Sequence, residues 1–175
     1  MSGDPTKANI WPDADVYVGA TDAQDPASVD EEFGADWDLV GLLDGEAGFV
    51  QEREEEVDDH YAWGGILVRT SRRNFKQTIT FTALEDNDTT RDLIWPDSPA
   101  GQLVVPRPKR IKIAFELRED DKVKRLISAF QAEVTVNGEI TESEGELTRY
   151  ELLATIFPTS EGVLFIEQKS EASSA

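Results

Sequence analysis

The sequence contains no cysteine and only one histidine, His60, among its 175 residues. Disulfide bonds and thiol catalysis are therefore excluded, and a single imidazole cannot build a histidine-based zinc site within one chain. No apolar run approaches the roughly 18 residues that a membrane-spanning helix needs. The fold is expected to depend on packing or assembly, and no membrane segment is expected.

Basic residues are scarce and unevenly placed. The chain has 36 acidic and 17 basic residues and a formal net charge of −19 at pH 7. Residues 12–60 hold 17 acids and one base, whereas residues 61–125 hold 13 bases and nine acids. A halophilic source would explain acidity but would spread it along the chain. The separation favours contacts between the acidic part of one copy and the basic part of another.

The chain is organised around residues 75–95. From Phe75 to Ala83, apolar residues alternate with lysine and threonine, which predicts a strand with one buried face. Residues 85–90 follow with acidic, asparagine and threonine side chains that favour a helix N-terminus. Apolar residues at 93–95 precede Pro96, which stops a helix. A short helix is therefore predicted at about 86–95.

Most of the remaining chain predicts strands. Alternating patterns bounded by turn residues lie at residues 15–20, 37–43, 48–57, 66–72, 109–118, 123–136, 147–157 and 163–167. A bulge is expected near 128–131, turns at 72–74 and 119–121, a hairpin turn at Asn137–Gly138, and surface loops at 21–36 and 58–65. The fold class is therefore mainly β: an antiparallel β-sandwich or barrel with one short flanking α-helix. We expect a single domain over 1–175, with an N-terminal arm at 1–12 and a flexible C-terminal tail at 168–175.

Two features indicate contact surfaces. The strand expected at 48–57 carries Glu52, Glu54 and Glu56 among charged neighbours, so acids fall on both of its faces. Such a strand suits a sheet that lines an aqueous channel or an edge guarded by charge. Tyr61 and Trp63 are displayed in the following loop, where large aromatic side chains indicate a contact surface.

A basic patch comprises Arg107, Lys109 and Arg110, with Lys112 nearby. No aromatic residues are interleaved with it, and the net charge of the chain opposes nucleic-acid binding. The acidic segment 51–59 of another copy is the favoured partner. Separate acidic and basic patches on one chain favour heterologous contacts, which close into rings or extend into filaments.

Catalytic patterns are nearly absent. His60 has no serine or cysteine nucleophile beside it, and the acids at 54–59 lack the sharp glycine turn of a calcium loop. Neither a phosphate-binding loop nor a dinucleotide fingerprint occurs. We expect no catalytic, cofactor-binding or metal-binding residues, and we do not expect an enzyme.

Three stretches together resemble the major tail (tail tube) proteins of long-tailed viruses of bacteria and archaea. They are residues 48–65, residues 75–95, and the segment Glu151–Pro158 with 161–163. The resemblance implies a β-sandwich or barrel core whose copies form hexameric rings, stacked into a tube with a continuous β-barrel as its inner wall. It also implies relatedness in fold to contractile-tail inner tubes and to the type VI secretion tube. The loop at about 58–65 would reach a neighbouring subunit.

The resemblance further implies a location in the virion tail after assembly in the host cytoplasm. The implied partners are other copies of the chain, a tape measure protein, tail terminator and baseplate or distal tail proteins, and double-stranded DNA that passes through the lumen without specific binding. An acidic wall suits that passage because it repels phosphate. We therefore hypothesise that Glu52, Glu54 and Glu56 face the lumen. Inter-subunit contacts are hypothesised for Tyr61, Trp63, Arg107, Lys109 and Arg110. Two alternatives stay open: a type VI secretion-like tube protein, and a halophilic monomeric β-sandwich binding module.

Overall fold

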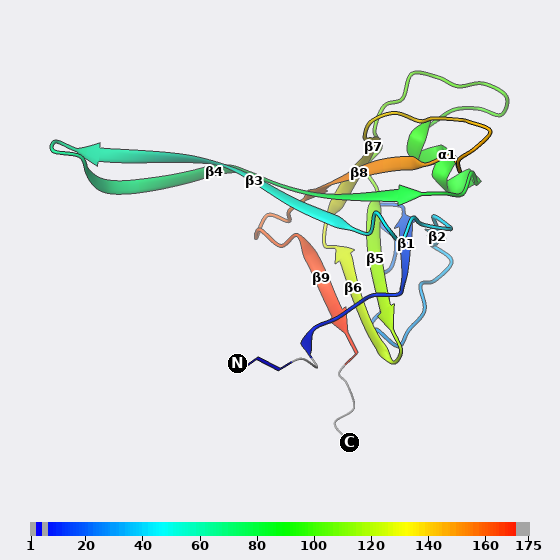
Figure 1. The fold of residues 1–175 in the computed structure, drawn as a ribbon, viewed down its shortest axis with the longest axis horizontal. Helices are drawn as coiled ribbons and strands as arrows, with labels where there is room; N and C mark the ends of the chain where they lie inside the picture. Colours follow the sequence, from blue (N-terminus) through cyan, green and yellow to red (C-terminus); the bar gives the residue numbers. More distant parts are fainter. Residues whose placement is uncertain (1–2, 5–6, 171–175) are drawn as a thin grey trace.

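A computed structural model describes residues 3–4 and 7–170 of the chain, which form two antiparallel sheets and one short helix (Figure 1). The five-stranded sheet has the order β2-β1-β5-β6-β9, and the four-stranded sheet has the order β3-β4-β8-β7. The elements are β1 (Asp13–Gly19), β2 (Trp37–Leu39), β3 (Val50–Ala62), β4 (Ile66–Ala83), α1 (Asp88–Ile94), β5 (Lys112–Glu119), β6 (Lys122–Ser128), β7 (Gln131–Val136), β8 (Tyr150–Phe157) and β9 (Phe165–Lys169). The predicted mainly β sandwich with one short helix is confirmed.

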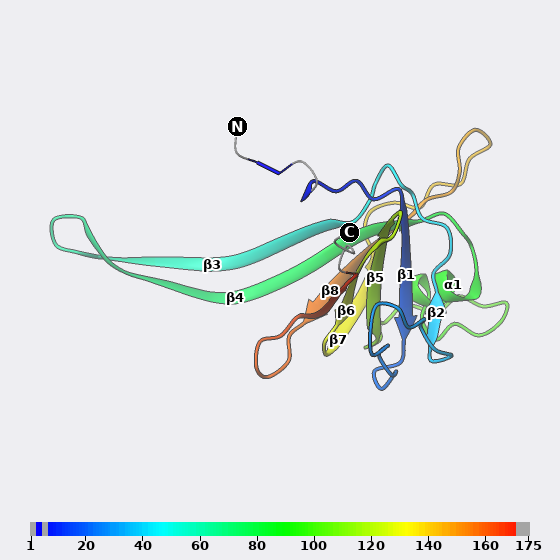
Figure 2. The same cartoon turned by 90° about the horizontal axis from the view of Figure 1, so that it is seen from below.

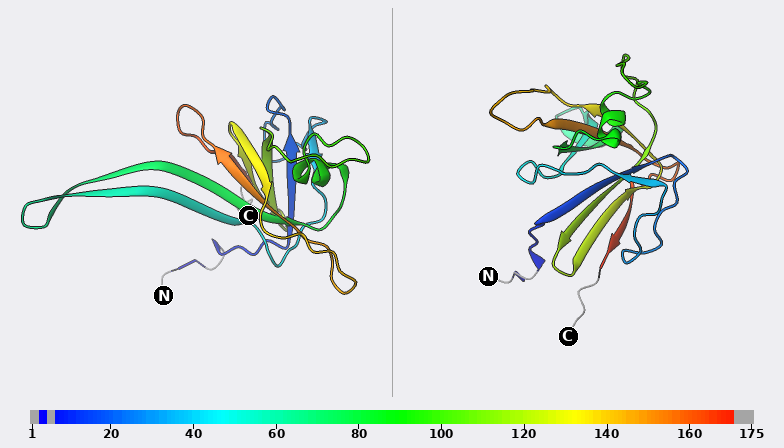
Figure 3. Two further views of the ribbon diagram at one scale, coloured as in Figure 1. Left: turned by 90° about the horizontal axis from the view of Figure 1, so that it is seen from above. Right: turned by 90° about the vertical axis from the view of Figure 1, so that its right-hand side faces the viewer.

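The hydrophobic core lies between the two sheets, which Figure 3 shows as separate layers in its right-hand view. Alternate residues of β4, including Ile79 and Phe81, face alternate residues of β5, including Ile113 and Phe115. The rings of Phe81 and Phe115 meet edge to face, with centroids 5.8 Å apart. Each of these fully buried side chains stabilises the fold by about 1.5–3 kcal/mol.

Helix α1 closes one end of this core. Asn87 is its N-cap, and the Asn87 Oδ1 atom accepts a hydrogen bond from the Thr90 backbone N at 2.9 Å. The same side chain donates from Nδ2 to the Val40 carbonyl at 2.8 Å, which ties the helix start to the chain beyond β2. Leu93 and Ile94 are buried in the core. The prediction of a short helix at about 86–95 is confirmed. The helix could be predicted because its sequence signals are local.

Residues 20–36 form an irregular loop, as expected, and the loop lies against the outside of the five-stranded sheet. Arg125 on β6 donates from Nη1 to the carbonyl oxygens of Ser28 at 3.1 Å and Glu31 at 2.7 Å. The Arg125 guanidinium also pairs with the Glu116 carboxylate on β5, and both residues are buried. A buried ion pair thus anchors an acidic loop to the sheet.

Three local predictions are wrong. The bulge expected near 128–131 is instead the point where the chain leaves β6 in one sheet and enters β7 in the other. The turn expected at Asn137–Gly138 is absent because only Gly138 has a positive φ, whereas a type I′ turn needs two such residues; a longer loop, residues 137–149, joins β7 to β8. The strand expected at 37–43 ends at Leu39, shortly before Gly41 with φ of 100°.

The chain ends differ from each other. The tail expected at 168–175 is wrong for its first residues, because Gln168 lies in β9 and donates from Nε2 to the Pro26 carbonyl at 2.7 Å. Ser170 follows and accepts a hydrogen bond at Oγ from the Val123 backbone N at 2.7 Å. Residues 171–175 lie outside the described residues. At the other end, residues 3–4 and 7–10 are exposed and belong to neither sheet, and the rest of the expected N-terminal arm before residue 7 is not described.

Candidate assembly surfaces

Strands β3 and β4 continue far beyond the sandwich as a two-stranded ribbon (Figures 1 and 2). They pair with each other from Val50↔Thr80 to Ala62↔Ile66. Strand β8 pairs with β4 only from Gln77 to Ala83, so the ribbon has no further strand beside it beyond that point. We call residues 54–76 the hairpin arm. At about 3.4 Å per residue, it projects roughly 30 Å.

The hairpin arm overturns two predictions. Residues 58–62 belong to β3 rather than to a loop, and the connection is a tight turn at Trp63, Gly64 and Gly65. The two glycines have φ of 89° and 77°, a backbone region that glycine adopts without steric cost. The turn expected at 72–74 is a bulge inside β4, where the register with β3 shifts between Glu54 and Glu56.

Asn74 produces this bulge. Its φ is 56°, a left-handed conformation that asparagine tolerates better than most residues. The Asn74 side chain donates from Nδ2 to Oε2 of Glu56 at 2.8 Å, which fastens the irregular point to the opposite strand. Because bulges bend a strand and increase its twist, this residue sets the direction in which the hairpin arm leaves the body.

Charged pairs cross the shaft of the hairpin arm. Arg72 pairs with Glu55 at 2.8 Å, and Arg73 pairs with Asp58 at 2.6 Å. These side chains are largely exposed, and such ion pairs contribute only about 0–1 kcal/mol each. An isolated two-stranded hairpin is at best marginally stable in water. The hairpin arm therefore needs another surface to hold its conformation.

The end of the hairpin arm is apolar. We call Tyr61, Trp63, Ile66, Leu67 and Val68 the arm tip. Every one of these side chains is exposed, and Trp63 is exposed completely. Apolar side chains grouped on a projecting element are costly in water and mark a contact site. The prediction that Tyr61 and Trp63 are displayed is confirmed, although a strand and a tight turn present them instead of a long loop.

Glu52, Glu54 and Glu56 lie on one face of β3. Side chains alternate along a strand, and the register pairs Glu52 with Thr78 and Glu54 with Lys76 on β4. Ile79 and Phe81 lie on the opposite face of β4 from Thr78, and they point into the core. The glutamates share the face of Thr78, so they point away from the core. Glu55 lies on the opposite face, so the acids do occupy both faces of the ribbon.

The same outward side of the four-stranded sheet continues across β4, β8 and β7, and we call it the outer sheet face. Its register partners are threonine, glutamate and one leucine: Thr78, Thr80, Thr82, Thr135, Thr155, Glu133, Glu151 and Leu153. Most of these side chains are polar or acidic. Thr78 and Thr82 are buried, and the loop between β7 and β8 lines a pocket with Thr82, so the face is open only in part. The face is therefore suited to contact with water or with a polar cargo.

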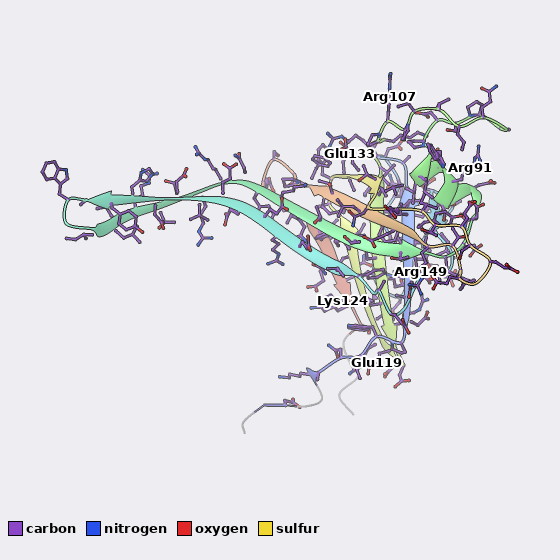
Figure 4. All side chains as sticks on the ribbon, turned by 45° about the horizontal axis from the view of Figure 1, so that its top comes forward. Arg91, Arg107, Glu119, Lys124, Glu133 and Arg149 are labelled. Atoms are coloured by element: carbon purple, nitrogen blue, oxygen red, sulfur yellow. The ribbon has the colours of Figure 1, made fainter. Side chains whose placement is uncertain are left out.

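The predicted basic patch does not act as one unit. Lys109 lies between Asp92 at 2.9 Å and Asp97 at 2.8 Å, and hydrogen bonds from Asp97 and Asp92 raise the pKa of Lys109. Arg110 pairs with Glu133 at 2.9 Å and stacks on a phenylalanine ring. Within the described residues, Arg107 alone of the three has no such partner. Figure 4 shows Arg107 on the loop above the body, away from the hairpin arm.

Sequence reasoning missed a groove at the root of the hairpin arm. The groove has a volume of about 680 Å³ and lies beside the start of β3. Its apolar walls are Trp11, Leu39, Leu42, Leu43, Phe49 and Leu117. Leu42 lies outside the strands, and its apolar side chain is 70% exposed. These residues come from separate stretches of the chain, so only Leu42–Leu43 beside the Asp44–Gly45 turn offered a local signal.

The fold and these surfaces define a class of molecule: an antiparallel β-sandwich with a projecting, apolar-tipped hairpin. No protein-family model matches the sequence, and no curated protein matches it either.

Across residues 3–4 and 7–170, no three acidic or histidine side chains gather in a way that could hold a metal ion. None of the helical structure in that part of the chain has the length and apolar character needed to cross a membrane.

Proposed function

We propose that this chain is a structural protein whose copies join head to tail into rings, and that the rings stack into the tail tube of a long-tailed virus of bacteria or archaea. The observation that carries the proposal is the hairpin arm. Its tip exposes Trp63 completely and contacts no other part of the described chain, so a second copy is the natural partner. A projecting element that docks elsewhere on an identical chain makes a heterologous contact, which closes into a ring or continues as a filament.

The edges of the four-stranded sheet support the same arrangement. Strands β3 and β7 are its two outer strands, and an edge strand offers unpaired backbone groups to a neighbour. On β7 this edge begins after Ala132, because the backbone N and O of Ala132 already bond to Ile111. When copies stand side by side, β7 of one copy can lie against β3 of the next. The four-stranded sheets then form one continuous wall around a bore. The resemblance noted in the sequence supplies the ring size of six.

The outer sheet face suits the inside of that wall. Threonine hydroxyls make this face polar, and its acids outnumber its bases. Glu52, Glu54, Glu56, Glu133 and Glu151 stand against Arg73, Lys76 and Arg110, so the face repels the phosphates of DNA on balance. A genome could slide along such a wall without being retained. In this proposal the protein has no catalytic role. A tape measure protein and double-stranded DNA occupy the bore in turn, and terminator and baseplate proteins cap the tube, which is part of the virion.

The hairpin arm also bears on the alternatives. A monomeric binding module has no use for a long ribbon with an apolar tip, because such a ribbon lowers solubility without adding to the core. A type VI secretion-like tube would share the ring geometry and differ in its cargo. The acidic outer sheet face favours a nucleic-acid cargo that must not bind.

The test is the assembly state of the purified chain. Sedimentation velocity and negative-stain images are expected to show rings or tubes with a central hole, together with monomers at low concentration. Trp63→Ala should remain monomeric with the circular dichroism spectrum of the wild type. Phe130→Ala, which removes another exposed aromatic side chain away from the hairpin arm, is the matched control and should assemble. A wild-type chain that stays monomeric at every salt and protein concentration would refute the proposal.

A further inference from the structure

The groove at the root of the hairpin arm is an unfilled apolar surface on the body. We define the arm-root groove by its apolar walls and by the acidic side chains around them. The acidic members are Asp13, Asp15, Asp44 and Glu85, against one base, Lys124. Lys124 marks this side of the body in Figure 4, remote from the turn of the hairpin arm. Arg118 pairs with both Asp13 and Asp15, and Arg149 pairs with Asp44, so the groove is apolar inside and weakly negative at its rim.

We propose that the arm-root groove of one copy receives the arm tip of the neighbouring copy. The inference rests on the proposed head-to-tail assembly and adds the receiving surface, which the fold alone does not name. The occupant is a second copy of this chain, and the anchoring side chains are Tyr61 and Trp63. Buried aromatic anchors that fill a pocket carry much of the binding energy in protein interfaces.

Geometry prevents a chain from filling its own groove. Phe49 and Gln51 line the groove at the start of β3, whereas Trp63 follows the end of the same strand. At about 3.4 Å per residue, the two ends of β3 are roughly 40 Å apart. A stiff ribbon cannot fold back over that length while its strands stay paired. Each contact therefore links two copies and leaves one tip and one groove free for the next contact.

Size and polarity of the groove match the arm tip. A volume of about 680 Å³ is large enough to hold more than one aromatic side chain. Leu39 and Leu42 are 45% and 70% exposed, so docking would cover apolar surface on both partners. Removing such surface from water is the main favourable term in association.

Charge favours docking of the arm tip in this groove over docking on the exposed apolar segment at residues 103–105. Arg69 on β4 lies next to the arm tip and has no acidic partner within the described residues. Glu85, the rim acid without an ion pair within the described residues, attracts this guanidinium. The competing segment, residues 103–105, is also apolar and exposed, but Arg107 follows it directly and repels Arg69. Complementary charge across an interface raises the rate of association and excludes wrong contacts.

The absence of cysteine allows a direct test by disulfide trapping. Ala62→Cys places a thiol beside the arm tip, and Gly45→Cys places one at the groove. A Cβ atom at Gly45 would meet nothing within 4 Å, so this change should be tolerated. The full-length double variant is oxidised and run on a non-reducing gel. We expect a ladder of covalent oligomers, whereas each single variant yields no species larger than a dimer.

The matched control pairs Ala62→Cys with Gln102→Cys, which lies beside the competing apolar segment, and it should yield no ladder. A ladder from the control instead would overturn the groove assignment, and so would rings in electron micrographs without a ladder from the first pair. Dimers alone from the first pair would indicate a reciprocal contact and would also overturn it. A chain that never assembles refutes the proposed function itself, so the two failures are distinguishable.

A second variant tests the groove without cross-linking. Leu42→Asp changes an exposed side chain, so the thermal unfolding temperature should stay close to that of the wild type. The concentration needed for assembly should rise about tenfold or more. An unchanged concentration would overturn the groove assignment even if the rings themselves persist.

Discussion

Arg53 on β3 donates a hydrogen bond from Nε to Oε1 of Gln77 on β4, and the two atoms are 3.1 Å apart. The two residues are direct register partners at the point where the hairpin arm leaves the sandwich. Gln77 is only 1% exposed, and its Nε2 atom donates to the Thr78 carbonyl at 3.1 Å. A satisfied, buried amide thus separates the hydrophobic core from the water-exposed ribbon.

Arg53→Ala should weaken this junction. It removes the donor to a buried amide oxygen, and leaving such a group unsatisfied costs about 1–3 kcal/mol. We expect a lower free energy of unfolding in urea and faster hydrogen–deuterium exchange over residues 54–76. Arg69→Ala, which removes an arginine from the same ribbon without an ion pair in the described chain, should alter neither when both are measured on the monomer at low concentration. Equal behaviour of the two variants would contradict the role assigned to Arg53.

Asn74 is expected to control the direction of the hairpin arm. Asn74→Ala removes the short polar side chain that makes the left-handed conformation tolerable, and it removes the hydrogen bond to Glu56. A residue such as alanine pays about 1–2 kcal/mol in that conformation. The strand should then straighten, and the fraction of assembled protein in sedimentation should fall. Asn74→Gly keeps the backbone conformation and should retain most assembly. If the two variants assemble equally well, the bulge does not direct the arm.

The strand and helix around residues 75–95 could be predicted because their signals are local. The alternation from Phe75 to Ala83 marks the strand, and the cap at Asn87 acts within its own turn. The expectation of a single buried face is wrong, because Thr78 and Thr82 are buried and Phe75 is 47% exposed. The length of the hairpin arm could not be predicted in this way. Both faces of residues 58–74 are exposed, so no contrast in polarity marks them as strand, and Asn74 gives a turn signal where the chain only bulges.

Features that depend on distant residues were also missed. The passage from β6 to β7 depends on which sheet each strand joins, and a bulge or a crossing produces the same local pattern. The common face of Glu52, Glu54 and Glu56 follows from alternation, but only the register with Thr78 shows that this face points away from the core. The arm-root groove is built from separate stretches, so no single window of sequence contains it.

The buried pair between Glu116 and Arg125 should be sensitive to the loss of one partner. Glu116→Ala leaves the Arg125 guanidinium without its counter-ion at a site that is only 6% exposed. Breaking a buried pair in this way typically costs about 3–5 kcal/mol. Thermal unfolding should occur at a clearly lower temperature, and limited proteolysis should cut within residues 20–36. Glu116→Leu combined with Arg125→Met should be less destabilised than Glu116→Ala; a larger loss in the double variant would contradict this account.

Stability should decrease in acid, partly because of Asp13. A hydrogen bond from Arg118 holds the pKa of Asp13 below its ordinary value. A carboxylate with a lowered folded-state pKa stabilises the fold above its unfolded pKa, about 3.9, and the contribution is lost as the pH falls through the folded value. Asp13→Asn should therefore show a flatter decline of the urea midpoint below about pH 4. The effect should be small because the Asp13 side chain is 62% exposed. Asp38 is exposed and has no ion pair in the described chain. The urea midpoint of Asp38→Asn should therefore decline with pH as that of the wild type does.

The charge of the outer sheet face should decide whether DNA is retained in an assembled tube. Changing Glu52 and Glu54 together to lysine reverses two charges per copy on one face of β3 and leaves Glu56 in place to accept the hydrogen bond from Asn74. A basic wall would bind phosphate through counterion release, so DNA retention should appear and should weaken steeply with added salt. Short duplex DNA held in the bore should be protected from nuclease, whereas DNA bound outside should be digested. Wild-type tubes should protect none.

The matched control reverses Asp30 and Glu32, which have the same spacing but lie in the exposed loop against the outside of the five-stranded sheet. Tubes of this control should bind DNA only on their outside, because the loop does not belong to the outer sheet face, so nuclease should remove that DNA. Electron micrographs must show intact tubes for both variants before protection is compared. Equal protection by the two variants would place the glutamates of β3 outside the bore, and protection by wild-type tubes would show that an acidic wall does not prevent retention.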